Sequence, residues 1–173
     1  MEKDIILVDE HDREIGSGEK MTVHREGLKH RAFSILIFNS RGEMMLQKRA
    51  ASKYHGGGLW TNACCSHPRS GEEIITAAQR RLFEEMGFSC DLEKIMELSY
   101  KFTMPNGLIE NEYDHVLLGF FDGEPELNPA EAQAWTWIKI EDLKKDLETS
   151  AANYTPWFKL IVEKLSNNNL FKK

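Results

Sequence analysis

The chain has 173 residues, the size of one domain, and we expect a single domain that spans residues 1–173. Its composition, 41% hydrophobic and 29% charged, is that of a globular protein and excludes a disordered, collagen-like or coiled-coil chain. The net charge of −6 argues against nucleic acid bound through a basic face, but it is compatible with a small anion held by a few local cations.

Cysteine usage and short apolar runs indicate a cytoplasmic protein. The cysteines, Cys64, Cys65 and Cys90, are odd in number and two are adjacent, which suits a reducing compartment better than a disulfide framework. The first residues are charged and lack a long apolar core, so we do not expect a secretory signal. The longest apolar runs, 33–38 and 116–121, are too short to span a membrane, and we expect no membrane partner.

Strand signals dominate the N-terminal third of the chain. Residues 4–9 are apolar with flanking charges and predict a first strand, which a polar turn follows at 11–18. Residues 32–38 and 43–48 then predict a hairpin whose turn is Asn-Ser-Arg-Gly at 39–42.

A glycine-rich loop and a helix come next. Three consecutive glycines at 56–58 imply unusual backbone angles or a close approach of the chain to another group. An extended run follows over 59–65, and the segment 71–88 predicts a helix with Glu72 and Glu73 in its first turn. The apolar face of this helix and the glycine that ends it are Ile75, Ala78, Leu82, Met86 and Gly87.

The C-terminal half mixes strands with helices. Residues 98–103, 112–121 and 135–140 predict strands. Residues 141–147 and 156–165 predict helices, and the second of these opens with a proline, which suits a first helical turn. Together the elements predict an α/β/α or α+β sandwich around a mixed sheet.

Histidines and glutamates form a first candidate cluster. Glu110 and Glu112 are two residues apart, so an extended strand would present both carboxylates on one side. His24 and His30 come just before the predicted hairpin, and His67 follows the glycine loop. Imidazoles mixed with carboxylates suit a divalent ion of the Zn, Mn or Mg range. Taken alone, such residues are more often solvated surface groups.

The segment RRLFEEMGF, 80–88, carries the first family resemblance. Preceded at the right spacing by Glu72, it resembles the Nudix helix, whose row of carboxylates holds a divalent ion against a diphosphate. The resemblance implies the Nudix fold, an α/β/α sandwich with a mixed β-sheet. Arg81 stands where a Nudix hydrolase has a metal-binding glutamate, which weakens the hydrolase interpretation, although a cation there could hold a phosphate.

Three further motifs resemble a more specific family than the Nudix helix does. WTNACCSHP at 60–68, ENE at 110–112 and TPW at 155–157 resemble the type I isopentenyl-diphosphate isomerase family, over about 20–157 of the chain. The resemblance implies isomerisation of a five-carbon diphosphate, in isoprenoid biosynthesis, by protonation and deprotonation on opposite faces. The catalytic cysteine and glutamate of the family map to Cys65 and Glu112.

The same resemblance implies the ions, the partner and the remaining site residues. One divalent ion, Mn²⁺, Mg²⁺ or Zn²⁺, would bind His24, His30, His67, Glu110 and Glu112. A Mg²⁺ that accompanies the diphosphate would bind Glu85 and the backbone carbonyl of Cys65. The residues matched to diphosphate binding are Lys20, Arg49, Lys53 and, from the helix, Arg81. The expected partner is a small-molecule diphosphate, and the expected state is a monomer or a weak dimer.

The chemistry of that reaction makes its own demands. Protonation of an alkene yields a tertiary carbocation, so the site needs an acid, a base on the opposite face and a group that shelters the cation. The π face of Trp157 could stabilise a desolvated cation by about 2 kcal/mol. Tyr100 corresponds to a family tyrosine that hydrogen-bonds near the catalytic glutamate. Without the family pattern, both aromatic residues could equally serve only in packing.

Two other functions compete with the isomerase. A Nudix pyrophosphohydrolase acting on a nucleoside diphosphate derivative would use the same fold, but Arg81 argues against it and it has no evident use for Cys65. A non-catalytic Nudix-like binding module is disfavoured by the complete acid–base set. The sequence leaves open which of Cys65 and Glu112 donates the proton.

Overall fold

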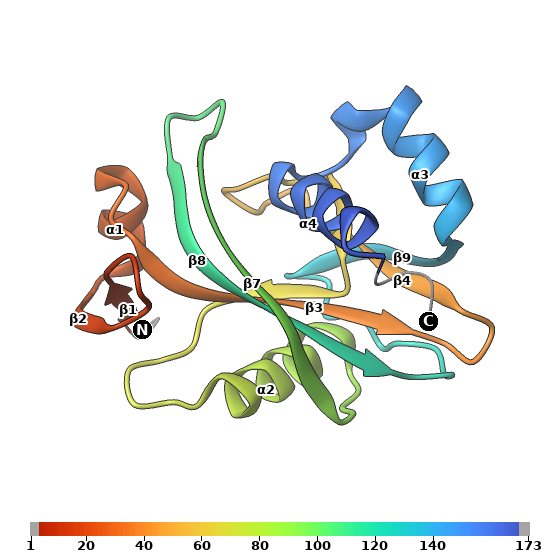
Figure 1. Ribbon diagram of the computed structural model, residues 1–173, viewed down its shortest axis with the longest axis horizontal. Helices are drawn as coiled ribbons and strands as arrows, with labels where there is room; N and C mark the ends of the chain where they lie inside the picture. Colours follow the sequence, from red (N-terminus) through yellow and green to blue (C-terminus); the bar gives the residue numbers. More distant parts are fainter. Residues whose placement is uncertain (1–3, 170–173) are drawn as a thin grey trace.

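The computed structural model describes residues 4–169 as a twisted mixed sheet with helices on both faces (Figure 1). Helix α2 (Ile74–Met86) covers one face, while α3 (Ile140–Thr149) and α4 (Pro156–Asn167) lie on the other. This is the sandwich that the sequence predicts. Within the described range, none of the helices is both long and apolar enough to cross a membrane.

The remaining elements complete the sheet and its connections. The short helix α1 covers Lys20–Glu26 and a 3-10 turn covers Ala151–Asn153. The strands are β1 Ile5–Val8, β2 Glu14–Gly18, β3 His30–Phe38, β4 Glu43–Arg49, β5 Trp60–Asn62, β6 Cys64–Ser66, β7 Leu92–Thr103, β8 Ile109–Phe120 and β9 Ala132–Lys139.

Strand β3 is the centre of the sheet and fixes its register. It runs parallel to β8, with pairing that begins at His30 and Glu112, and antiparallel to β6, where Ser34 faces Cys65. From residue 32 onwards its residues are apolar except Ser34 and almost all buried, as expected for a strand covered on both faces. These two pairings therefore bring segments far apart in the sequence to one end of the sheet.

The side chains of β3 alternate between two hydrophobic cores. Phe33, Ile35 and Ile37 pack towards α2 with Leu82 and Met86, all buried. Leu36 points to the other face and packs in the core that contains Trp157 and Phe158 of α4. Burial of each such side chain stabilises the fold by about 1.5–3 kcal/mol, so the two cores clamp both faces of β3.

The predicted extended run over 59–65 is interrupted. Ala63 separates β5, which pairs with β4, from β6, which pairs with β3. The buried Asn62 side chain donates hydrogen bonds to the carbonyl oxygens of Ile35 and Cys64, which supports the local change of direction.

Three other boundaries differ from the prediction. Residues 14–18 form β2 rather than a turn, because they pair with β1 although they lack an alternating apolar pattern. Strand β7 begins at Leu92 rather than at residue 98, because its charged first half is held by pairing with β8. Helix α2 begins at Ile74, so Glu72 and Glu73 precede it and Glu72 instead accepts hydrogen bonds from Arg80.

Helix α1 was not predicted from the sequence. Its seven residues give too short a periodic signal, and its cap is a glutamate, Glu19, whose carboxylate accepts from the amides of Met21 and Thr22. Gly27 ends the helix in a left-handed conformation with φ of 66°. The helix matters for function because it carries both Lys20 and His24.

The glycines at 56–58 are each required by geometry. Gly56 and Gly58 adopt positive φ angles of 54° and 79°. A Cβ atom on Gly57 would lie 2.6 Å from the carbonyl oxygen of Ala51 and 2.8 Å from that of Lys53. The loop is therefore closed tightly on the preceding turn, as the run of glycines predicts.

We predict that Gly57→Ala lowers the free energy of unfolding by about 1–3 kcal/mol, because the added methyl group overlaps two carbonyl oxygens. The amides of Gly58 and Leu59, which donate to the carbonyl oxygens of Arg49 and Gly56, should exchange faster with solvent. Gly42→Ala is the control, since open space surrounds its added carbon and only the left-handed backbone costs about 1–2 kcal/mol. Equal exchange of the two loop amides in both variants would contradict the packing argument.

Candidate active site

A pocket opens at the end of the sheet where α1, β6, β8 and α4 meet. Ten of the residues that line it were expected from the sequence: Lys20, Arg49, Lys53, Cys65, His67, Arg81, Glu85, Glu110, Glu112 and Trp157. Three others were not: Tyr54, His55 and Ser66. Tyr100, His24 and His30 lie behind the pocket wall and are buried.

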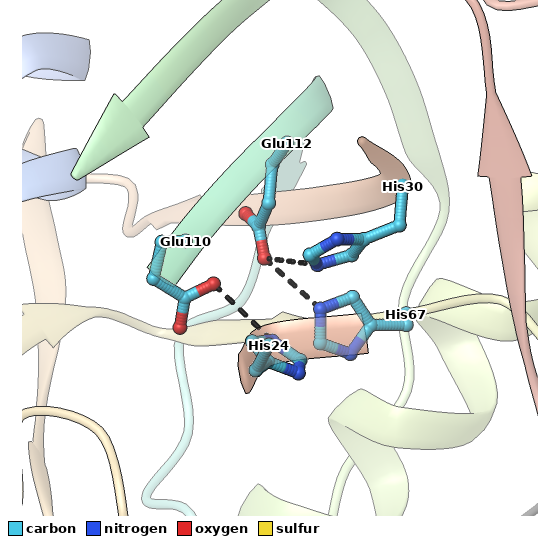
Figure 2. Close-up of side chains that lie close together, drawn as sticks. All are labelled: His24, His30, His67, Glu110 and Glu112. Carbon is cyan, nitrogen blue, oxygen red and sulfur yellow. Dashed lines mark hydrogen bonds and ion pairs between the residues drawn. The ribbon is translucent and has the colours of Figure 1, made fainter. Parts of the chain in front are cut away.

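Five of these side chains converge on one point (Figure 2). One ligand atom from each residue lies within 4.8 Å of the others, and the residues are His24, His30, His67, Glu110 and Glu112. Nε2 of His24 is 3.4 Å from Oε2 of Glu110. Oε1 of Glu112 is 3.3 Å from Nε2 of His30 and 2.9 Å from Nε2 of His67.

Hydrogen bonds orient two of the imidazoles towards this point. Nδ1 of His24 lies 2.6 Å from the carbonyl oxygen of Lys20, and Nδ1 of His30 lies 2.9 Å from that of Leu28. Each Nδ1 therefore carries the proton, which leaves Nε2 of both rings with a lone pair directed into the cluster. This is the arrangement that metal-binding histidines adopt.

Electrostatics in the cluster fit a divalent ion. Burial and the neighbouring Glu112 raise the pKa of Glu110 well above its usual range. Burial acts to raise the pKa of Glu112 as well, but the close approach of the His30 and His67 rings to its carboxylate holds it well below that range. Burial lowers the pKa of His67 to about 3, so its ring is neutral, as a metal ligand must be. Nε2 of His30 and Oε2 of Glu110 are buried and receive no hydrogen bond from any described residue.

The pocket also holds a thiol and a carboxylate in different protonation states. Burial raises the pKa of Cys65 to about 12, so its thiol is protonated, and Sγ donates a 3.0 Å hydrogen bond to Oδ1 of Asn62. Glu112 is ionised and accepts a hydrogen bond from the hydroxyl of Tyr100. Cys64, by contrast, is fully buried in the core beneath α2, on the opposite side of β6 from Cys65.

The predicted phosphate-binding cations also line the pocket. Nε of Arg49 donates to the carbonyl oxygen of His55, and its guanidinium lies 5.4 Å from the centre of the Trp157 ring. Nζ of Lys20 lies 4.9 Å from the centre of the Tyr54 ring. The remaining two, Lys53 and Arg81, form ion pairs with carboxylates.

Sequence reasoning missed a buried polar pair behind the site. Asp114 is fully buried and accepts a 2.8 Å hydrogen bond from Oγ of Ser34, which also lies 3.5 Å from Sγ of Cys65. Burial and the charge of Glu112 raise the pKa of Asp114 well above its usual range. The sequence did carry a signal for Asp114. Glu110, Glu112 and Asp114 occupy every second position of β8, so their side chains lie on one face of the strand.

His55 was also missed. It is buried, its Nε2 lies 3.2 Å from Oε1 of Glu110, and burial lowers its pKa to about 3. Only its place beside the glycine loop could have indicated it from the sequence.

Comparisons with known proteins agree with this geometry. The NUDIX domain family matches residues 28–158. A curated "Isopentenyl-diphosphate Delta-isomerase" from Serratia proteamaculans is 49% identical over 170 residues, 98% of this chain and 95% of that protein. "Isopentenyl-diphosphate Delta-isomerase 1" from Aromatoleum aromaticum is 50% identical over 165 residues, covering 95% and 93%.

Solved structures confirm the fold. DR0079 from Deinococcus radiodurans superimposes with a TM-score of 0.77 at 19% identity, over 94% of this chain and 98% of that one. The MutT protein from Methanosarcina mazei Go1 gives a TM-score of 0.68 at 19% identity, over 82% and 95%. Both likenesses support the Nudix-type sandwich that the helix motif predicts.

We predict that Glu110→Gln and His67→Ala each lose the tightly held metal ion, with affinity lowered at least about 100-fold, because each removes one ligand from a closed set. Elemental analysis after gel filtration measures the ion content of each chain. Glu97→Gln is the control, since it changes a carboxylate of the same sheet outside the cluster and should leave the content unchanged. Full metal content in both ligand variants would refute the proposed set.

Proposed function

Because the chain belongs to the isopentenyl-diphosphate Delta-isomerase family of NUDIX-domain proteins, we propose that its pocket isomerises isopentenyl diphosphate with the Cys65 thiol and the Glu112 carboxylate. The reaction interconverts isopentenyl diphosphate and dimethylallyl diphosphate and belongs to isoprenoid biosynthesis. One observation carries the residue assignment: the Cys65 thiol and the Glu112 carboxylate line the same pocket. Their surroundings raise the pKa of the thiol and lower that of the carboxylate, which favours one proton donor and one acceptor.

The proton balance requires two groups. One proton adds to the terminal carbon of the double bond and leaves a tertiary carbocation, and a second proton leaves the carbon on the other side of the cationic centre. Cys65 and Glu112 serve as this pair, and Tyr100 holds Glu112 through its hydroxyl. After one turnover, one member of the pair has lost a proton and the other has gained one.

The carbocation needs a neighbour that does not react with it. Trp157 is 4% exposed, comes from the first turn of α4 and lines the pocket, so its indole is available to shelter the cation. A desolvated cation over such a ring gains about 2 kcal/mol. Because Pro156 and the buried core around Phe158 fix this turn, the ring is positioned before substrate binds.

Two divalent ions fit the polar part of the pocket. The His/Glu cluster suits Mn²⁺, Mg²⁺ or Zn²⁺, and Glu85 with the carbonyl of Cys65 suits a Mg²⁺ that accompanies the diphosphate. When bound, these ions supply positive charge, to Glu112 in the first site and to the diphosphate in the second. Lys20, Arg49, Lys53 and Arg81 supply the remaining charge to the small-molecule diphosphate.

The competing pyrophosphohydrolase receives less support. Arg81 takes the place of a helix carboxylate and neutralises Glu84 and Glu85 instead of adding a metal ligand beside them. A hydrolase also has no need for the buried thiol. A monomeric or weakly dimeric state and a cytoplasmic location stay predictions from the sequence.

Incubation of isopentenyl diphosphate with the enzyme and Mg²⁺ in D₂O tests the proposed reaction. An isomerase incorporates deuterium into dimethylallyl diphosphate, because at least one transferred proton exchanges with solvent. Release of inorganic phosphate or a monophosphate without isomerisation would indicate the hydrolase.

We predict that Cys65→Ala lowers turnover at least about 10²-fold, the lower end of the contribution of a positioned acid or base. Cys64→Ala is the matched control, since its thiol packs in the core, and it should cost modest stability and little turnover. Steady-state kinetics of both variants make the comparison. Peptide mapping after labelling with a diphosphate-bearing epoxide should find the label on Cys65. Near-normal turnover of Cys65→Ala, or label on Cys64, would overturn the assignment.

A further inference from the structure

The guanidinium of Arg81 is surrounded by carboxylates. Its Nη1 donates to Glu84 at 2.6 Å, and its Nη2 donates to Glu85 at 2.7 Å and to Glu131 at 3.1 Å. Nε completes the set with a 3.1 Å hydrogen bond to Oγ of Ser66. Every nitrogen of this side chain is therefore engaged with protein groups and not directed at open solvent.

Glu85 is equally engaged. Its Oε1 accepts from Arg81, and its Oε2 accepts from Nε2 of the buried Gln47 at 2.9 Å. Glu85 is itself only 4% exposed. Any ion that binds this carboxylate has to compete with Arg81 for the same oxygen or displace the amide of Gln47.

Glu131 connects the cluster to a second cation. Its Oε2 lies 2.5 Å from Nζ of Lys53, and its Oε1 is the atom that accepts from Arg81. Its backbone is held by a hydrogen bond from its own amide to Asn128, while the amide of Asn128 donates to the carbonyl of Glu85. The carboxylates thus come from two segments that are bound to each other.

The position of Arg81 is that of a cation bound to a carboxylate cluster. Three carboxylates around one point repel each other and attract a divalent ion unless a positive charge already lies between them. Burial by itself would lower the pKa of Arg81, but the charges of Glu85 and Glu131 raise it, so the guanidinium stays charged. A divalent ion approaching Glu85 therefore meets a fixed positive charge.

We propose that Arg81 is a placeholder cation, which holds Glu84, Glu85 and Glu131 together and keeps Mg²⁺ away from Glu85 until the diphosphate binds. The proposal rests on the proposed function, in which Glu85 binds Mg²⁺ together with the substrate. The diphosphate supplies both anionic oxygens for the ion and a new partner for the guanidinium, which pairs with phosphate as readily as with carboxylate. Binding of ion and substrate is then linked, because one residue turns from the carboxylates to the phosphates.

Equilibrium dialysis with Mn²⁺ as the probe tests this proposal directly. Metal-stripped protein is dialysed with and without inorganic pyrophosphate at equal concentration on both sides, and bound Mn²⁺ is counted by atomic absorption. The wild type should bind one ion per chain without pyrophosphate, in the His/Glu cluster, and two ions with it. Arg81→Gln and the more apolar Arg81→Met should bind the second ion without pyrophosphate, with affinity at least about tenfold above that of the wild type.

Two controls separate the charge of Arg81 from its packing. Arg81→Lys loses the forked hydrogen bonds but keeps a positive charge beside Glu85, so it should still require pyrophosphate for the second ion. The double variant Arg81→Gln with Glu85→Gln should lose the ion that Arg81→Gln gains. Failure of both Arg81→Gln and Arg81→Met to bind a second ion without pyrophosphate would overturn the proposal, as would two ions in the wild type under that condition. Deuterium incorporation from D₂O measures the isomerisation independently of Mn²⁺ binding. A wrong reaction assignment would therefore show in that experiment and not in the dialysis.

Discussion

Burial of two carboxylates beside three imidazoles is the constraint on which the rest of the structure depends. Moving charged groups out of water costs several kcal/mol each unless partners compensate. Here Glu110 and Glu112 lie between His24, His30 and His67, all at least largely buried, with ligand atoms within 4.8 Å of one another. A divalent ion is the partner that this set of atoms fits, and it would tie α1, β3, β8 and the segment after β6 together at one point.

The sheet is arranged to make this cluster possible. Parallel pairing of β3 with β8 sets His30 beside Glu112, and antiparallel pairing of β3 with β6 sets Cys65 beside Ser34. The end of the sheet that carries the His/Glu cluster thus also presents the thiol, and in the proposed function Glu112 is both a ligand of the ion and a reacting group. Tyr100 and Asp114 are buried beside it, and the hydroxyl of Tyr100 donates a hydrogen bond to Glu112.

Much of this architecture could be predicted from the sequence. The strands at 32–38 and 43–48 with their turn, the helix that ends at Gly87 and the alternation of Glu110 with Glu112 are strong local signals, and family motifs supplied the remaining site residues. The predicted hairpin pairing is present only beside the turn, at Phe38 and Met44, because β4 pairs along its length with β9. Local signals could not reveal β2, whose exposed residues are held only by pairing, or α1, whose cap is a glutamate. Likewise the carboxylates around Arg81 include Glu131, fifty positions away, and only the folded chain brings them together.

X-ray absorption at the edge of the bound metal tests the central claim most directly, because it reports the atoms around the ion in the intact protein. The account predicts a shell of nitrogen and oxygen alone, at about 2.0–2.2 Å if the ion is Zn²⁺, with the multiple scattering of imidazole rings. It predicts no sulfur, since Cys65 contributes its protonated thiol to the reaction and not to the ion. A sulfur neighbour at about 2.3 Å, or a spectrum without imidazole scattering, would contradict it.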